Sequence, residues 1–429
     1  MRSSCRWPRD PAWPPVRLCD TAMTDTLDTV RDRLAESLTD WDVTEDDLKD
    51  IHSTLASVSP SEINDVVAQL GDEELQHWAD EANSWVNGLS AGDRDALLNT
   101  LAGALDGTQL ARVADAFGVE PTTAAVIRAG DATQKVEYLD ALGSQIQGGP
   151  QAFTANFGSM TTHYGNAEAH AAADVLASLA DSPNAFADAV RRLDQAGKLD
   201  GVLEAASGHA STTISTGAML PPVTLHDFQP ATLDRIIGAA QGGDLALRTT
   251  VFESAAEALG AMQSAISSTP GGDPRLDATA DNTAKALSGL LGRDEAIAAG
   301  IGIVPEHPPT ASPTANIELA SQHRDFPLNL PWFKDQVDSH APWDYKQQGA
   351  QYENFGNFNY GMTAAAAGIP EDVALRAAGW KQQQSGTSRP EWGGPLDFGG
   401  SYGDDPRDQQ QIRDGYAYHR SGLWRVWGD

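Results

Sequence analysis

The stretch DALLNTLAGALDGTQLARVADAFG, residues 95–118, indicates the fold class of this chain. Its apolar residues recur at helical spacing in two stripes, Leu97, Leu98, Leu101 and Leu105, then Leu110, Val113 and Phe117. Such stripes are typical of amphipathic helices that bury one face. Gly107 lies between the two stripes and Gly118 follows the second, and we expect each glycine to end a helix. The stretch therefore predicts two short helices.

The same pattern extends over most of the chain. It returns in AVRRLDQAGKLDGVLEAASG, residues 189–208, and in other Ala- and Leu-rich segments of a leader that spans residues 23–303. The repeat is too uneven for a named solenoid, so we expect an irregular array of short antiparallel helices. One interruption, SGHASTTISTGAMLPPVTLH at 207–226, fits either a short strand pair or a plain linker, and it marks a possible break in the leader.

The first 22 residues differ from the rest. They are rich in Arg, Pro and Trp, and they hold both cysteines, Cys5 and Cys19. We expect residues 1–22 to be an upstream extension or a disordered segment, with Met23 opening the natural chain; a targeting peptide is the alternative, but no apolar core of suitable length is present. A start at Met23 leaves no cysteine, which excludes disulfides, thiol catalysis and cysteine metal sites.

Charge limits the partners. The 429 residues carry a formal net charge of -31, enough length for two or three domains, and only seven lysines against 22 arginines. Acid excess with few lysines resembles the halophile-like composition of proteins adapted to high salt, and a specific acidic function is the alternative. A polyanionic partner is disfavoured over most of the surface. No run of 18 apolar residues occurs, so no membrane span is expected.

A change of composition marks a C-terminal domain. Prolines in VPEHPPTASPTAN begin a segment, 304–325, that we expect to be an extended linker. Six of the eleven Trp and six of the eight Tyr lie beyond Pro327. Aromatics and glycines on loops are typical of a compact domain that carries a site. We therefore expect a mainly α protein, in which the helical array is followed by a compact, loop-rich, mostly helical domain over 326–429.

Four segments of this domain carry its polar and aromatic residues. They are APWDYKQQ at 341–348, YENFGNFNYG at 352–361, AAGWKQQQSG at 377–386 and YGDDPRDQQQIRDGYAYH at 402–419. Asparagine and glycine are poor helix residues, and in the second segment they alternate with bulky rings. We therefore expect YENFGNFNYG to form a shaped loop or short hairpin.

In this order and at the C-terminus of a helical leader, the four segments resemble the polymorphic toxin type 44 domain. The resemblance covers roughly residues 326–420. It implies the terminal payload of a bacterial toxin used in interbacterial competition, which stays in the cytoplasm until it is secreted or injected into a target cell. It also implies a cognate immunity protein and delivery by secretion or contractile injection machinery.

The residues themselves predict a two-carboxylate site. On a continuous helix through DYKQQGAQYE, Lys346 and Glu353 would share one face, and the surrounding rings would raise the pKa of Glu353 toward that of a general acid. Asp404 and Asp405 would supply the second carboxylate. A protonated acid and an ionised partner are the minimum for glycoside hydrolysis. The catalytic residues would thus be Glu353, Asp404, Asp405 and Lys346.

Amides, phenols and rings would hold a sugar, because amides and phenols both donate and accept hydrogen bonds and rings stack on pyranoses. The predicted substrate-binding residues are Asn357, Asn359, Tyr360, Trp380, Gln383 and Asp408. We expect no cofactor and no metal site, since no Walker A loop, GxSxG elbow or HExxH helix occurs and the aspartates lack the spacing of an EF-hand.

Several of these residues have structural alternatives. Asp405 before Pro406 has the pattern of a helix N-cap, with Asp408 in the first turn. Lys346 and Asp344 would form an exposed ion pair of little energetic weight. Asn357 and Asn359 would satisfy loop backbone groups.

Three function classes remain open: a toxin that hydrolyses cell-wall glycan, a nuclease toxin that acts on RNA or DNA, and a non-enzymatic carbohydrate-binding or structural protein. Residues 326–429 hold 9 Lys and Arg against 13 Asp and Glu, and they contain no basic run to neutralise phosphates. A cell-wall polysaccharide is therefore the favoured substrate over nucleic acid. The number of carboxylates argues against a pure binding module.

Overall fold

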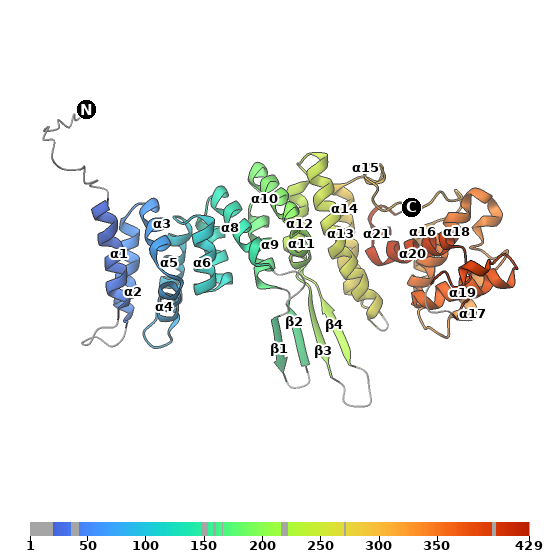
Figure 1. The fold of residues 1–429 in the computed structure, drawn as a ribbon, viewed down its shortest axis with the longest axis horizontal. Coiled ribbons are helices and arrows are strands. Elements are labelled where there is room, and N and C mark those ends of the chain that lie inside the picture. The colour runs from blue at the N-terminus through green and yellow to red at the C-terminus, as the bar shows by residue number, and fades with distance from the viewer. Residues whose placement is uncertain are drawn as a thin grey trace. The chain divides into compact units, whose positions relative to one another are not determined.

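The computed structural model describes residues 20–35, 43–146, 153–157, 160–164, 166–215, 222–269, 272–396 and 400–428. The predicted extension at residues 1–22 lies almost wholly outside this range. The chain divides into two compact units, residues 1–141 and 142–429. Figure 1 shows the helices and strands of each with their labels. As predicted, the protein is mainly α. Among the described helices, none combines the length and the apolar character needed to cross a membrane.

The first unit consists of short helices that pack their apolar faces together. They are α1 (Asp20–Leu34), α2 (Glu45–Ser57), α3 (Pro60–Gln69), α4 (Asp72–Asn83), α5 (Ala91–Ala102), α6 (Gly107–Phe117), α7 (Val119–Ala129) and α8 (Ala132–Gln145), the last of which continues past the boundary. Both predicted stripes are buried in α5, α6 and the turn between them. Local signals set the starts, such as Ser59 before Pro60 in α3 and the Asp106 side chain, which accepts from the Gln109 amide and caps α6.

The predicted stop at Gly107 is wrong. Helix α5 already ends at Gly103, and Gly107 is the first residue of α6. A Cβ at Gly107 would lie 2.3 Å from the Glu137 carbonyl carbon, so this glycine serves the close approach of α8 rather than a turn. Gly118 does end α6, with φ of 103°.

The first half of the second unit combines helices with one small sheet. The helices are α9 (Ala167–Ser178), α10 (Pro183–Gln195), α11 (Leu199–Ala206), α12 (Ala231–Ala240), α13 (Leu245–Ser268), α14 (Pro274–Leu290) and α15 (Arg293–Ala298). The antiparallel sheet has the order β1 (Phe153–Phe157), β2 (Met160–Tyr164), β3 (Ala210–Ile214) and β4 (Val223–Asp227). The segment 207–226 thus contributes strands rather than a plain linker, whereas the hairpin of β1 and β2 was not predicted.

The C-terminal domain is helical. Its elements are α16 (Pro313–Ser321), α17 (Leu330–Val337), the 3-10 turns η1 (Tyr345–Gln348), η2 (Ala350–Tyr352) and η3 (Pro390–Trp392), α18 (Glu353–Ala366), α19 (Glu371–Gln384), α20 (Pro406–Ser421) and α21 (Trp424–Trp427). Residues 304–325, expected as a linker, include α16, whose Ile317 and Ala320 are buried in the same core as α18.

The segment YENFGNFNYG is a helix, so the predicted loop or hairpin is wrong. Phe355, Phe358 and Met362 lie on one buried face of α18. Gly361 allows α20 to approach, since a Cβ there would lie 2.0 Å from the Ile412 carbonyl oxygen. Gly415 of α20 allows the same close approach from the other helix, since a Cβ there would lie 2.1 Å from the Phe358 carbonyl oxygen. Backbone-to-backbone packing therefore outweighs the low helix propensity of the segment.

Candidate functional site

A cavity of about 460 Å³ lies between α17, α18, α19 and the start of α20. All residues that line it fall between Leu330 and Ile412, which is inside the C-terminal domain. One wall is aromatic and includes Phe333, Trp343 and Tyr360. The Tyr360 hydroxyl donates to the Ala374 carbonyl oxygen at 3.1 Å, and burial raises its pKa well above the usual range. Tyr360 therefore contributes a neutral, fixed ring.

Two carboxyl groups of the cavity come from the start of α20. Asp404 is buried and accepts hydrogen bonds from Gln409 Nε2 at 2.8 Å and from the Asp405 amide at 3.0 Å. Burial raises its pKa, while these bonds and the nearby Lys346 charge act against that rise. The pKa of Asp408 rises to about 6, through burial first and then through the charges of Asp404 and Glu353. Asp408 can thus hold a proton at a pH close to neutral, beside a second buried carboxyl group.

A third carboxylate, Asp344, was not predicted as a site residue. One of its oxygens accepts the backbone N–H of His340 at 2.7 Å. The other oxygen is buried and has no hydrogen-bond partner in the part of the chain that the structure describes. His340 has φ of 63°, a conformation that side chains rarely adopt and that often marks functional sites. A sequence signal existed, since Asp344 lies directly between two rings in WDY.

Cations surround the cavity. Lys334, Lys346 and Lys381 line it, and they are three of the seven lysines in a chain of net charge -31. Asp338 bridges Lys334 at 2.8 Å and Lys381 at 2.6 Å, and these hydrogen bonds hold the pKa of Asp338 far below its usual range. The predicted pair between Lys346 and Asp344 is not formed.

The cavity brings together six of the ten predicted site residues. These are Lys346, Asn357, Tyr360, Trp380, Asp404 and Asp408. The amide nitrogen Asn357 Nδ2 is buried without a hydrogen-bond partner among the described residues. Together with the unpaired oxygen of Asp344, it offers a donor and an acceptor to a polar ligand.

Glu353 is not among the residues that line the cavity. The predicted continuous helix through DYKQQGAQYE is wrong, because Gly349 separates η1 from η2 and α18 begins only at Glu353. Glu353 is exposed at that start. Its charge still raises the pKa of Asp408, so it lies close enough to influence the cavity.

Three further predicted residues have other places. Asn359 is fully buried in the core, where its Oδ1 accepts from Asn316 Nδ2 at 2.7 Å. Asp405 is the N-cap of α20, as its alternative reading predicts, and it pairs with Arg407 at 2.9 Å. Gln383 lines a separate small pocket, whereas its neighbours Gln382 and Gln384 line the cavity.

The described residues contain no group of three or more His, Cys, Asp or Glu placed to hold a metal ion. The cavity instead offers the Asp408 carboxyl with its raised pKa, three further carboxyls, an ammonium on Lys346 that forms no ion pair among the described residues, and exposed aromatic surface at Trp380. This set of groups suits proton transfer to a polar organic substrate.

Residues 336–421 match the family model described as "Bacterial toxin 44". No curated protein and no solved structure matched the chain. The match contains every cavity-lining residue except those of the first part of α17. Residues 336–421 therefore form a bacterial toxin domain of this type, and the resemblance seen in the sequence is confirmed.

Proposed function

We propose that the toxin 44 domain hydrolyses bacterial cell-wall glycan, with Asp408 as the general acid and Asp404 as the second carboxylate. The observation that carries this proposal is the raised pKa of Asp408, about 6, in a cavity it shares with buried Asp404. Glycoside hydrolysis needs a carboxyl group that keeps its proton near neutral pH and a partner that remains ionised. Burial raises the pKa of Asp404, whereas the hydrogen bonds from Gln409 and from the Asp405 amide favour its ionised form.

The other groups would assist. The Lys346 charge acts against the rise in the pKa of both aspartates, although burial prevails. Glu353, first predicted as the acid itself, would act through its charge on Asp408. Trp380, which is 54% exposed at the edge of the cavity, would stack on a sugar ring. Asn357 would donate a hydrogen bond from Nδ2 to a hydroxyl or acetamido group, and Asp344 would accept one at Oδ1, since both atoms lack partners among the described residues.

A nuclease is the second candidate, and one observation favours it. Three of the seven lysines line the cavity, which would attract an anionic substrate such as a phosphodiester. Asp338 neutralises part of this charge, because it pairs with both Lys334 and Lys381. Of the three lining lysines, Lys346 is the one that forms no ion pair with a described residue, and a single ammonium is a weak basis for binding a polyanion.

The full chain expressed in a test bacterium, once in the cytoplasm and once with a periplasmic signal, separates the candidates. Wall hydrolysis predicts killing only from the periplasm, with new reducing ends in purified cell walls, and loss of both effects in Asp408→Asn. Asp414→Asn is the matched control, because Asp414 lies on the same helix and outside the cavity lining. Killing only from the cytoplasm, with degraded RNA or DNA, would favour the nuclease. No killing from either compartment would favour a binding protein.

As a toxin domain, this part of the chain would be neutralised in the producing cell by an immunity protein that covers the cavity. Delivery by secretion or contractile injection would carry it from the cytoplasm to its target. The helical leader would serve loading or presentation.

A further inference from the structure

Helices α13 and α14 of the leader form a surface on which the last residues of the chain lie. Arg425 of α21 is the central contact, and its side chain is only 9% exposed. Its guanidinium donates to Asp281 at 2.5 Å, to Asp277 at 2.9 Å and to Gln263 Oε1 at 3.0 Å. Asp277 and Asp281 are one turn apart on α14, so they present two carboxylates to one planar group.

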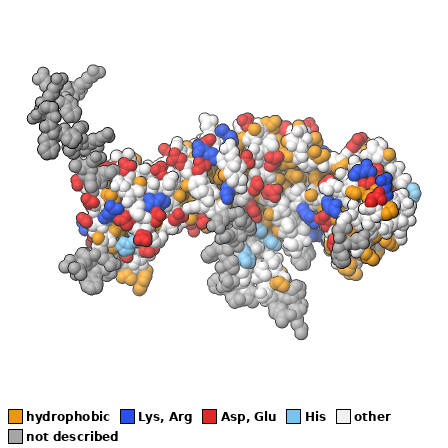
Figure 2. Space-filling view, viewed as in Figure 1, with side chains coloured by type: hydrophobic (Ala, Val, Ile, Leu, Met, Phe, Trp, Pro, Cys, Tyr) orange, Lys and Arg blue, Asp and Glu red, His pale blue; other side chains and the backbone are white. Residues whose placement is uncertain are grey.

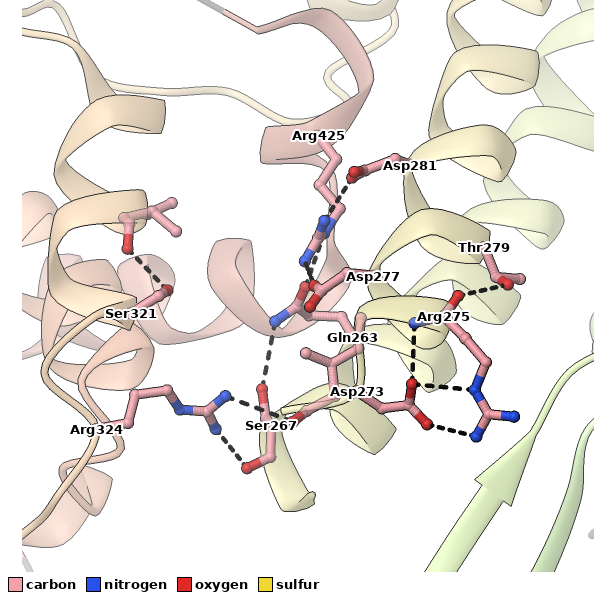
Figure 3. A network of polar contacts seen from close by, with 12 residues as sticks. Gln263, Ser267, Asp273, Arg275, Asp277, Thr279, Asp281, Ser321, Arg324 and Arg425 are labelled. Atoms are coloured by element: carbon pink, nitrogen blue, oxygen red, sulfur yellow. Dashed lines mark hydrogen bonds and ion pairs between the residues drawn. The ribbon is translucent and has the colours of Figure 1, made fainter. Parts of the chain in front are cut away.

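A second arginine extends this contact. Arg324, which follows α16, donates to the backbone oxygens of Ile266 and Ser267 at the C-terminal end of α13. Gln263 links the two arginines, since its Nε2 donates to Ser267 Oγ at 3.3 Å (Figure 3). Cations favour the C-terminal end of a helix, where carbonyl groups lack partners within the helix. Both arginines therefore bind complementary charge on the leader.

Apolar contacts complete the surface. The Trp427 ring stacks on Phe252 of α13 with ring centroids 5.4 Å apart, and its indole N–H donates to the Leu291 carbonyl oxygen at 3.0 Å. Gly422 ends α20 with φ of 72° and turns the chain toward α13. Its Cβ position would lie 2.9 Å from Leu259 Cγ, so only glycine fits this approach without a shift.

The match to the toxin family ends at residue 421, immediately before Gly422. Arg425, which pairs with Asp277 and Asp281 of α14, and Trp427, which stacks on Phe252 of α13, thus lie outside the matched domain. We propose that α13 and α14 are a docking surface for the chain's own C-terminal segment, residues 422–428, and that this segment fastens the toxin domain to its leader as one rigid body. The connection through residues 299–312 is then not the main link between the two.

A cut of the connection tests this proposal in the full chain. A protease recognition sequence is inserted after Ile303, which is 59% exposed between α15 and α16. After cleavage, we expect the two fragments to elute together in size-exclusion chromatography. The variant Arg425→Ala with Trp427→Ala is expected to release the C-terminal fragment. Asp277→Asn with Asp281→Asn, changed on the opposite side, is expected to do the same.

Arg407→Ala is the matched control, because Arg407 is exposed on α20 and, among the described residues, forms its ion pair with neighbouring Asp405; its fragments should stay together. Circular dichroism of each uncut variant establishes that it is folded before the cut. The proposal is overturned if the wild-type fragments separate, or if they remain together in both docking variants. Loss of fold in the Arg425 variant leaves the Asp277 and Asp281 variant to decide.

Discussion

At the scale of single residues, the site depends on one carboxyl group whose environment disfavours its charge. Asp408 lies in the first turn of α20, where the helix dipole alone would lower its pKa. Burial and the charges of Asp404 and Glu353 act in the opposite direction and prevail, because the pKa rises to about 6. Ionising such a buried carboxyl group costs folding stability, so its position at a cavity is better explained by a role in catalysis than by a contribution to the fold.

This cost predicts a pH-dependent gain of stability in Asp408→Asn. The folded-state pKa of about 6 exceeds the ordinary value of 3.8, so the wild type loses stability as pH rises from about 4 to 6, and the asparagine variant does not. After a discount for partial exposure, we expect the variant to be more stable by about 1 kcal/mol at pH 7 and equal at pH 4. Urea unfolding at the two pH values measures the difference. Equal stability at pH 7 would contradict the raised pKa.

Glu353 offers a second test, in the pH dependence of activity. Its charge raises the pKa of Asp408, so Glu353→Gln should lower that pKa. We expect the fall in kcat/KM on the alkaline side to move to lower pH by a fraction of a unit, with activity at pH 5 largely kept. Complete loss of activity at all pH values would instead return Glu353 to the role of acid.

The residue types that form the site could be predicted from the sequence better than the role of each residue. The composition of APWDYKQQ and YGDDPRDQQQ indicated a site with several carboxylates, and Asp404, Asp408 and Lys346 do line one cavity. Which carboxyl holds the proton depends on burial and on neighbours from other helices, and neither can be read from spacing. The same limit explains Asp344, whose free oxygen is visible only once the His340 turn is in place.

At the scale of elements, the crossing of α18 and α20 organises the domain. Gly361 and Gly415 bring the two backbones into contact, and this contact sets the position of Asp404 and Asp408 at the start of α20. The glycines and asparagines of YENFGNFNYG predicted a loop. Propensity describes an isolated segment, and it could not reveal that a partner helix requires those glycines.

The crossing predicts opposite effects for two glycines of α18. A Cβ at Gly361 would overlap the Ile412 carbonyl oxygen, so Gly361→Ala should destabilise the fold by about 3 kcal/mol or more. At Gly356 the nearest atom to a Cβ is the Lys346 nitrogen at 3.9 Å, an ordinary contact. Gly356→Ala should therefore be neutral or add up to about 1 kcal/mol through helix propensity. Thermal unfolding of both variants decides; similar shifts in the two would refute the close crossing.

At the scale of the whole molecule, charge is spread rather than concentrated. Acidic side chains are scattered over the face shown in Figure 2, in keeping with a net charge of -31. The helical class was predictable from periodicity, and a C-terminal domain that carries a site was predictable from composition, whereas its toxin type came from the resemblance of four segments to a known family. The attachment of that domain to α13 and α14 was not, since it depends on contacts between residues more than a hundred positions apart, such as Arg425 and Asp281.

This charge predicts that the fold needs salt. Repulsion among the carboxylates is screened over about 30 Å at 0.01 M salt and over about 3 Å at 1 M. We expect the unfolding midpoint to rise by about 10 °C or more between these concentrations of KCl. Sucrose at equal osmolarity is the control for solvent exclusion and should give a smaller rise. A midpoint that does not depend on KCl would show that the acidic surface has another purpose.

The residues that form the cavity wall bear on when the toxin domain can act. Every residue that lines the cavity lies between Leu330 and Ile412, so no described helix of the leader plugs its mouth. In this respect the protein differs from a zymogen, which becomes active when proteolysis removes a blocking peptide. The toxin would act wherever it first reaches its substrate, so its location rather than proteolytic processing would determine which cell is damaged.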